Sequence, residues 1–200
     1  MDGLKIEFNL RPSPKAEDWA NKFIAGRSWK QGALVAISPG ALMPHKKWPL
    51  LKYLNLVKML LSRYENVKFL VIGSPLDKVL ADEISELNPQ RVINLCGINI
   101  DESAAILKHV NLAIGNDGGA MHLAAAMGCK VVSMIPGIEH PNSVYPWNNA
   151  NNVVQIDVNC APCYSFSSCP RGDNRCMVEI PFELVLSRSC IAIEQLLSSN

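Results

Sequence analysis

The sequence lacks the features of a secreted or membrane-spanning protein. Its first residues, MDGLKIEFNLRPSPK, contain no apolar h-region and no small-residue cleavage site, so no secretory signal is predicted. No apolar run approaches the roughly 20 residues that a helix needs to cross a bilayer. We therefore expect a cytoplasmic location. Three scattered cysteines in apolar surroundings fit this expectation as buried, reduced thiols, namely Cys96, Cys129 and Cys190.

A net excess of charge of either sign is also nearly absent. The formal net charge of the 200 residues is +1, so no bulk field points to nucleic acid or an anionic membrane, and we expect no nucleic-acid partner. The chain is 48% hydrophobic and 18% charged, which suits one domain with a sizeable core. Any recognition of phosphate must therefore be local.

Two common nucleotide-binding fingerprints are missing. The sequence contains no G-x-G-x-x-G after its first predicted strand and no G-x-x-x-x-G-K-[ST]. Both NAD binding and P-loop chemistry are thereby disfavoured.

What the sequence does contain is a regular alternation of short apolar runs and helical patterns. The runs are continuous rather than alternating, which is typical of parallel strands covered on both faces. This predicts an α/β fold with a Rossmann-like, doubly wound parallel sheet, whose ligands sit at the carboxyl ends of the strands. We expect strands at 33–38, 67–72, 92–95, 112–114, 131–135 and 153–156, helices at 50–63, 77–87, 101–108, 119–127 and 182–197, and ligand loops at 39–49, 73–77, 95–101, 115–119 and 136–148.

The chain divides into two unequal parts by composition. Residues 1–32 are polar and irregular, with room for a short helix at 15–25, and are interpreted as a linker or lead-in segment rather than a core element. Residues 33–200 carry the regular alternation and are predicted to form the ligand-binding domain.

The loop that follows the first predicted strand could bind an anion. Gly40 and Ala41 keep the backbone free of bulk, and Lys46 and Lys47 supply ammonium groups beside the start of the next helix. The alternative is a solvated loop with two surface lysines and a packed Trp48.

The loop after the fourth predicted strand has a glycine-rich turn. Gly118 and Gly119 would bare the first N–H groups of the following helix, so that a diphosphate could approach closely. Asp117 could instead be only the N-cap of that helix. His122 lies about one turn into the helix, where it could orient the loop or reach a ligand, although a lone helical histidine is more often simply packed.

Together the two loops resemble the C-terminal domain of glycosyltransferase family 9, the lipopolysaccharide heptosyltransferase family. The resemblance rests on Pro-Gly-Ala followed by Lys-Lys-Trp-Pro and, about 70 residues later, on Gly-Asn-Asp-Gly-Gly-Ala-Met-His-Leu-Ala-Ala-Ala. It covers roughly residues 33–197. The family usually has Ser or Thr where Gly118 stands, so a hydroxyl contact is absent here.

The resemblance implies one half of a GT-B glycosyltransferase. It places Lys46 on the phosphates of a nucleotide-sugar donor, typically ADP-heptose, and Asp117 at the transferred sugar or the loop beside it. It further implies that the amides of Gly118, Gly119 and Ala120 hold the diphosphate and that His122 supports that turn, while the loop 73–77 approaches the nucleoside. No catalytic acid or base is identified in the chain.

The function implied is inverting glycosyl transfer in lipopolysaccharide core synthesis, without a required cofactor. A lipopolysaccharide or other glycan acceptor would be bound by an N-terminal domain, for which 200 residues leave no room, so we expect the chain not to act alone. Peripheral membrane association of the full enzyme stays open. So do two alternatives: a non-catalytic nucleotide-sugar binding module or subunit, and another GT-B enzyme such as a nucleotide-sugar epimerase.

Four cysteines form a separate cluster with the spacing C-x2-C-x5-C-x6-C, at Cys160, Cys163, Cys169 and Cys176. Four thiols within 17 residues could hold a structural zinc ion. The second pair is more widely spaced than in the usual zinc signatures. Reduced thiols and adventitious disulfides therefore remain as alternatives.

Overall fold

The computed structural model describes residues 10–27, 29 and 32–198, and within them six parallel strands form one sheet. The strand order is β3-β2-β1-β4-β5-β6, which reverses direction between β1 and β4 and so creates a topological switch point there. The strands are β1 (Ala33–Ser38), β2 (Val67–Val71), β3 (Val92–Asn94), β4 (Leu112–Asn116), β5 (Lys130–Met134) and β6 (Val153–Val154).

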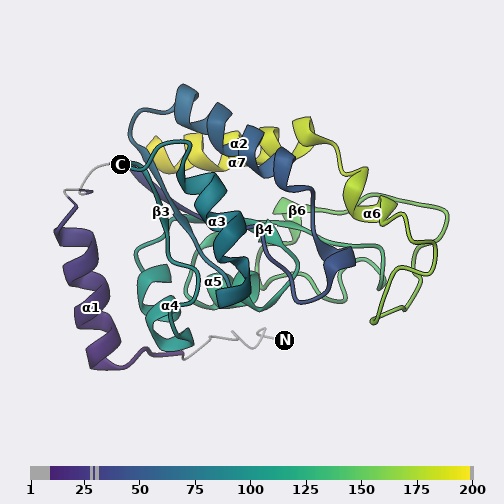
Figure 1. The fold of residues 1–200 in the computed structure, drawn as a ribbon, viewed down its shortest axis with the longest axis horizontal. Helices are drawn as coiled ribbons and strands as arrows, with labels where there is room; N and C mark the ends of the chain where they lie inside the picture. Colours follow the sequence, from purple (N-terminus) through teal and green to yellow (C-terminus); the bar gives the residue numbers. More distant parts are fainter. Residues whose placement is uncertain (1–9, 28, 30–31, 199–200) are drawn as a thin grey trace, which may run out of the picture.

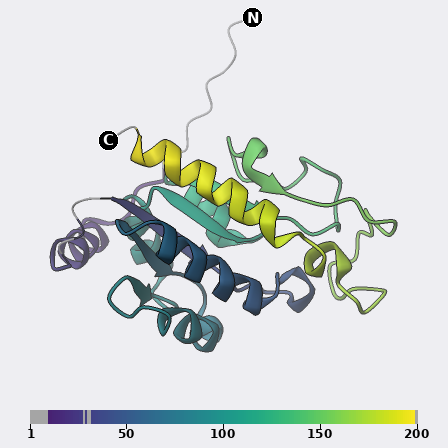
Figure 2. The same ribbon diagram turned by 90° about the horizontal axis from the view of Figure 1, so that it is seen from above.

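Helices cover both faces of this sheet (Figure 1). On one face α2 and α7 run side by side, as Figure 2 shows, with α3 beside them. On the other face lie α4, α5 and α1. The helices are α1 (Pro14–Ala25), α2 (Leu50–Arg63), α3 (Lys78–Ser85), α4 (Ile100–Leu107), α5 (Gly119–Ala126), α6 (Arg175–Val178) and α7 (Phe182–Leu197), with short 3-10 turns at Pro44–Lys46, Pro75–Asp77 and Ala150–Asn152.

The central strand β1 shows why the apolar runs are continuous. Its side chains alternate in direction, and all six of its residues are buried. Val35 and Ile37 pack in the core under α2, α3 and α7, while Leu34 and Ala36 pack in the core under α1, α4 and α5. A strand with a helical layer on each side must be apolar at every position, so the predicted fold class is confirmed.

The segment before the first strand contributes to this core, contrary to the expectation for residues 1–32. Ser13 caps α1, and Ala16 and Ala20 are buried against the α4 side of the sheet. Ser13 also donates to Asp101 at the start of α4, with Oγ to Oδ2 at 2.5 Å. The small alanines allow this close packing, and Trp19, Phe23 and Ile24 pack beside them. Residues 1–9, 28, 30 and 31 lie outside the described residues, and the boundary at residue 33 stays a prediction.

Element boundaries mostly agree with the predicted ones to within a few residues. The last strand is shorter than expected and ends at Val154. The third helix begins at Lys78, because Asp77 closes a 3-10 turn with Ser74 instead of entering the helix. None of the helices within the described part of the chain has the length and apolarity needed to cross a bilayer.

Candidate functional site

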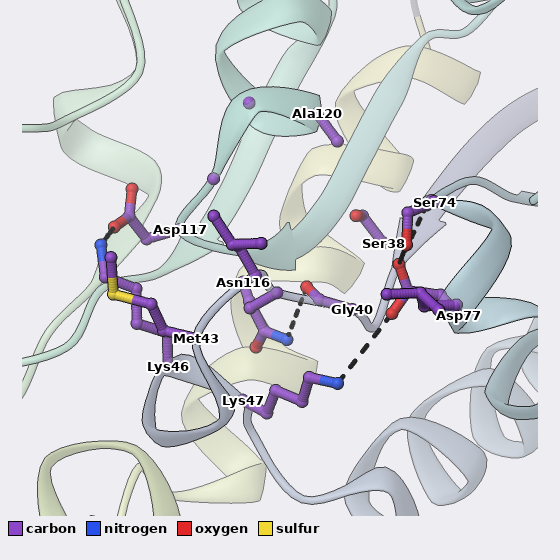
Figure 3. A pocket seen from close by; sticks show the side chains of 16 residues that line it. Ser38, Gly40, Met43, Lys46, Lys47, Ser74, Asp77, Asn116, Asp117 and Ala120 are labelled. Carbon is purple, nitrogen blue, oxygen red and sulfur yellow. Dashed lines mark hydrogen bonds and ion pairs between the residues drawn. The ribbon is translucent and has the colours of Figure 1, made fainter. Parts of the chain in front are cut away.

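A cavity of about 490 Å³ opens at the carboxyl ends of β1, β2 and β4, at the switch point of the sheet (Figure 3). Three loops line it, namely residues 38–47, 73–77 and 116–120. The loops at 95–101 and 136–148, which were also predicted to reach the ligand, contribute no lining residue to this cavity. Its volume lies in the usual range for small-ligand sites.

The loop that carries Lys46 is firmly held. Trp48 is 1% exposed, its ring stacks on Phe182, and its indole N–H donates to the carbonyl of Ile180 at 3.3 Å. Packing therefore accounts for Trp48, as the simpler alternative proposed. Lys46 itself is not a solvated surface residue, because its side chain is only 15% exposed.

Lys46 and Asp117 lie on two different loops, 71 residues apart in sequence, and their side chains contact each other (Figure 3). Lys46 Nζ donates to Asp117 Oδ2 at 2.7 Å, and His122 Nε2 lies 3.8 Å from Asp117 Oδ1. Burial raises the pKa of the Asp117 carboxyl, but hydrogen bonds and charge from His122 and Lys46 outweigh it and hold the pKa below its ordinary value.

Asp117 is therefore not the helix cap that the simpler interpretation suggested. The residue at the N-cap of α5 is Gly118, and no side chain in the described part of the chain makes a capping hydrogen bond there. The carboxylate of Asp117 instead pairs with Lys46. This leaves the first N–H groups of α5 without a side-chain acceptor, and they add a partial positive charge beside the cavity.

The glycine turn leaves open space at the same place. Gly118 is extended, with φ 167° and ψ 176°, and a Cβ built there meets only one atom, at 4.0 Å. A Cβ at Gly119 meets nothing within 4 Å. The structure thus brings most of the predicted site residues to one cavity. Those that line it are Gly40, Ala41, Lys46, Asp117, Gly118, Gly119 and Ala120. His122 does not line the cavity and approaches it only through Asp117.

The sequence predicted Asp77 as the start of a helix and as part of the 73–77 loop near the nucleoside, but assigned its side chain no role. Its Oδ2 accepts hydrogen bonds from Ser74 N at 2.9 Å and Ser74 Oγ at 2.7 Å, and its Oδ1 lies 4.0 Å from Lys47 Nζ (Figure 3). A Cβ on residue 40 would come within 2.3 Å of this carboxyl group, so the close packing of Asp77 against the backbone requires glycine at this position. The Ser-x-x-Asp spacing of a capping box was the available signal.

The four clustered cysteines lie around a second cavity, of about 190 Å³, away from the first. All four are free and partly buried, and the backbone N–H of Cys163 donates to the carbonyl of Gly137. Burial raises the pKa of the Cys176 thiol, and the neighbouring thiols add to this. Across residues 10–27, 29 and 32–198, no three His, Cys, Asp or Glu side chains are arranged to hold a metal ion as they stand.

The three scattered cysteines, by contrast, are buried and free as predicted. Burial raises the pKa of the Cys96 and Cys129 thiols to about 12 in each case, so both stay protonated at neutral pH.

The sequence that builds the first cavity matches a known protein family. The family model described as "Glycosyltransferase family 9 (heptosyltransferase)" matches residues 6–170. The chain belongs to glycosyltransferase family 9. The match includes all three loops of the cavity and begins well before residue 33, where the resemblance was expected to start.

Curated relatives within glycosyltransferase family 9 are heptosyltransferases. The chain is 27% identical over 193 residues to lipooligosaccharide heptosyltransferase 2 of Campylobacter jejuni, a match that covers 93% of this chain and 56% of that protein. The match to the Haemophilus influenzae enzyme of the same name is 26% identical and covers 76% of this chain and 45% of that protein. The chain thus spans about half the length of the curated relatives it matches.

The fold is shared with solved structures of the same family. The structure of E. coli ADP-heptose lps heptosyltransferase II superimposes with a TM-score of 0.70 at 22% identity, covering 94% of this chain and 54% of that one. A dodecameric iron-containing heptosyltransferase, TibC, solved in complex with ADP-D-beta-D-heptose, gives a TM-score of 0.64 at 21% identity and covers 83% of this chain and 46% of that one.

Proposed function

We propose that this chain binds the nucleotide-sugar donor of an inverting heptosyltransferase that acts in lipopolysaccharide core synthesis, with ADP-heptose as the donor. The observation that carries the proposal is the Lys46–Asp117 pair at the open end of the sheet, beside the N-terminus of α5 and a cavity of about 490 Å³. Relatives named heptosyltransferases, one of them solved with an ADP-heptose, support the choice of donor.

The chemistry follows from the positions of the charges. An acceptor hydroxyl attacks the anomeric carbon of the sugar, the carbon–oxygen bond to the diphosphate breaks, and the diphosphate leaves with the bonding electrons. Lys46 and the amides of Gly118, Gly119 and Ala120 would stabilise the charge that develops on the leaving group. Asp117 would release Lys46 to the diphosphate and turn toward the sugar, and His122 would hold the turn.

The chain on its own is proposed to bind donor without transferring sugar. Both carboxylates that line the cavity are already engaged, Asp117 by Lys46 and Asp77 by Ser74 and Lys47. Asp77 is therefore not free to take a proton from an acceptor, and Asp117, once Lys46 has moved to the diphosphate, would be engaged by the donor sugar. A second Rossmann-like domain on the N-terminal side would supply the base and bind the glycan acceptor, and the full enzyme would meet that acceptor at the membrane surface.

A thermal-shift panel of ADP-, UDP- and GDP-sugars tests the donor proposal. Ligands that bind the folded state raise the melting temperature, and we expect ADP-heptose to give the largest shift. An absence of any shift at millimolar nucleotide would overturn it. Sugar transfer to a lipopolysaccharide acceptor by the chain alone would overturn the proposal that it lacks a catalytic base and support a complete enzyme over the non-catalytic binding module.

A second proposal concerns the cysteines. Cys160, Cys163, Cys169 and Cys176 line one cavity of about 190 Å³, and one structural neighbour is described as iron-containing, so we infer that they hold a structural metal, zinc or iron. Binding would require the thiols to turn toward a common centre.

Elemental analysis of the purified protein tests this. We expect about one metal per chain, lost in Cys169→Ser and retained in Cys190→Ser, which removes a buried cysteine outside the cluster. Metal-free native protein, or equal metal in both variants, would contradict the proposal.

A further inference from the structure

Asn116, the last residue of β4, makes four hydrogen bonds while being only 2% exposed. Its Nδ2 donates to the carbonyls of Pro39 at 2.7 Å and Gly40 at 3.2 Å, the second of which is drawn in Figure 3. Its Oδ1 accepts from the backbone N–H of Trp48 and from the hydroxyl of Tyr53, both at 2.9 Å.

These four bonds use the whole capacity of the side chain. A primary amide has two N–H donors and an oxygen that accepts two hydrogen bonds. Although Asn116 borders the cavity, it has no donor or acceptor left for a ligand. Asn116 can therefore affect the ligand only through the protein groups to which it is hydrogen-bonded.

The groups it holds stand at both ends of one loop. Pro39 and Gly40 begin the segment that follows β1, and Trp48 ends it, so Lys46 lies between two points fixed by the same side chain. The next residue along β4 is Asp117, the partner of Lys46. One amide therefore sets where the ammonium group of Lys46 stands relative to the carboxylate of Asp117.

Other residue types of similar size would not do this. Aspartate would place acceptor oxygens against the carbonyls of Pro39 and Gly40 and bury a second charge beside Asp117. Leucine would leave the Trp48 N–H without its acceptor and the Tyr53 hydroxyl with only the carbonyl of Ser38, at 3.3 Å, and an unpaired buried donor is costly. An amide is the side chain that satisfies two carbonyls and two donors at once.

We propose that Asn116 is the positioning residue for Lys46: it ties the 39–48 loop to the end of β4 and so holds the ammonium group where the diphosphate of the donor binds. This rests on the proposed function. It predicts that substitution of Asn116 weakens binding of the diphosphate and leaves binding of the nucleoside unchanged.

The experiment compares Asn116→Ser with Asn94→Ser. Asn94 ends β3 as Asn116 ends β4, but it bonds the carbonyl of Lys78, the carboxylate of Asp82 and the N–H of Cys96, none of which lies in the 39–48 loop. Affinities for ADP and for adenosine are measured by calorimetry below the melting temperature of each variant. We expect ADP binding to weaken about tenfold in Asn116→Ser with adenosine binding changed less than twofold, and neither to change in Asn94→Ser.

A double-mutant cycle separates positioning from general damage. In a Lys46→Met background, Asn116→Ser should weaken ADP binding by less than a further twofold, because the group it positions is gone. Additive losses, or an equal loss for adenosine and ADP, would overturn the proposal. If Asn116→Ser does not fold, Tyr53→Phe removes one donor to Oδ1 without changing the core volume, and should weaken ADP binding two- to threefold with adenosine unchanged.

A ligand-free readout keeps this inference separate from the proposed function. The titration of the Asp117 carboxyl, followed by its carbon-13 chemical shift, should move to higher pH in Asn116→Ser, because Lys46 no longer stands 2.7 Å away, and should not move in Asn94→Ser. Unchanged titration would overturn the positioning role. A shifted titration in a protein whose native form binds no ADP would retain the positioning of Lys46 and overturn the donor site instead.

Discussion

Replacing Lys46 by methionine removes the ammonium group and keeps most of the length and apolar stem of the side chain. In the native chain this group is 15% exposed and donates to Asp117 at 2.7 Å. The variant therefore leaves a buried carboxylate whose remaining neighbour is His122, at 3.8 Å. Two effects follow, one on stability and one on binding, and they have different sizes.

The effect on stability is that of one charged hydrogen bond. Such bonds are worth about 1.5–3 kcal/mol when one partner is lost, and we expect a loss of this order in the free energy of unfolding. The effect on binding is a difference of two interactions. At an effective dielectric constant of 20, a unit charge pair 4 Å apart is worth about 4 kcal/mol, but Lys46 must leave Asp117 before it reaches the diphosphate. A net loss of about 1.5–3 kcal/mol remains, or roughly 10- to 150-fold in Kd.

The assay is a calorimetric titration with ADP on native protein, Lys46→Met and Lys58→Met. Lys58 is exposed on α2 and outside the cavity, so its variant removes the same charge without touching the site. We expect weaker ADP binding in Lys46→Met alone. Equal affinities in Lys46→Met and native protein would refute the assignment of Lys46 to the diphosphate.

The remaining predictions concern pH and packing. Because the folded pKa of Asp117 is depressed, its contribution to stability is present above the unfolded value near pH 4 and is lost as the pH falls through the folded value. Urea unfolding should therefore show native protein more stable than Asp117→Asn at pH 6, with the gap closing toward pH 2; a gap that does not depend on pH contradicts this. Gly40→Ala should lower the melting temperature, since its Cβ would stand 2.3 Å from Asp77, at a cost of about 1–3 kcal/mol. Gly119→Ala, with nothing within 4 Å, should melt like the native protein, and equal losses in both variants would count against the close-approach argument.

Sequence patterns predicted the sheet well because parallel strands buried on both faces leave a strong signal. Val35 and Ile37 face one helical layer and Leu34 and Ala36 the other, so β1 reads as an unbroken apolar run. The packing of α1 leaves a weaker signal. Apolar residues recur at helical spacing, namely Ala16, Trp19, Ala20, Phe23 and Ile24, but the two fully buried ones are small alanines among polar residues.

The two loops of the site were predicted because charged residues and glycines there interrupt the apolar pattern at strand ends. Their mutual contact was not, since it depends on strand order: β1 and β4 are neighbours only because the sheet reverses between them. The role of Asn116 was missed for the same reason, since it bonds backbone groups of Pro39 and Trp48 that only the strand order brings close. The role of Asp77 is local, and the Ser-x-x-Asp spacing could have shown it.

The most direct test of the donor site is a crystal structure of this chain with ADP. We expect the diphosphate between Lys46 and the amides at the start of α5, with Lys46 Nζ about 2.7–2.9 Å from a phosphate oxygen and its bond to Asp117 broken. ADP bound elsewhere, or bound with the Lys46–Asp117 pair intact and no contact to Lys46, would contradict the account.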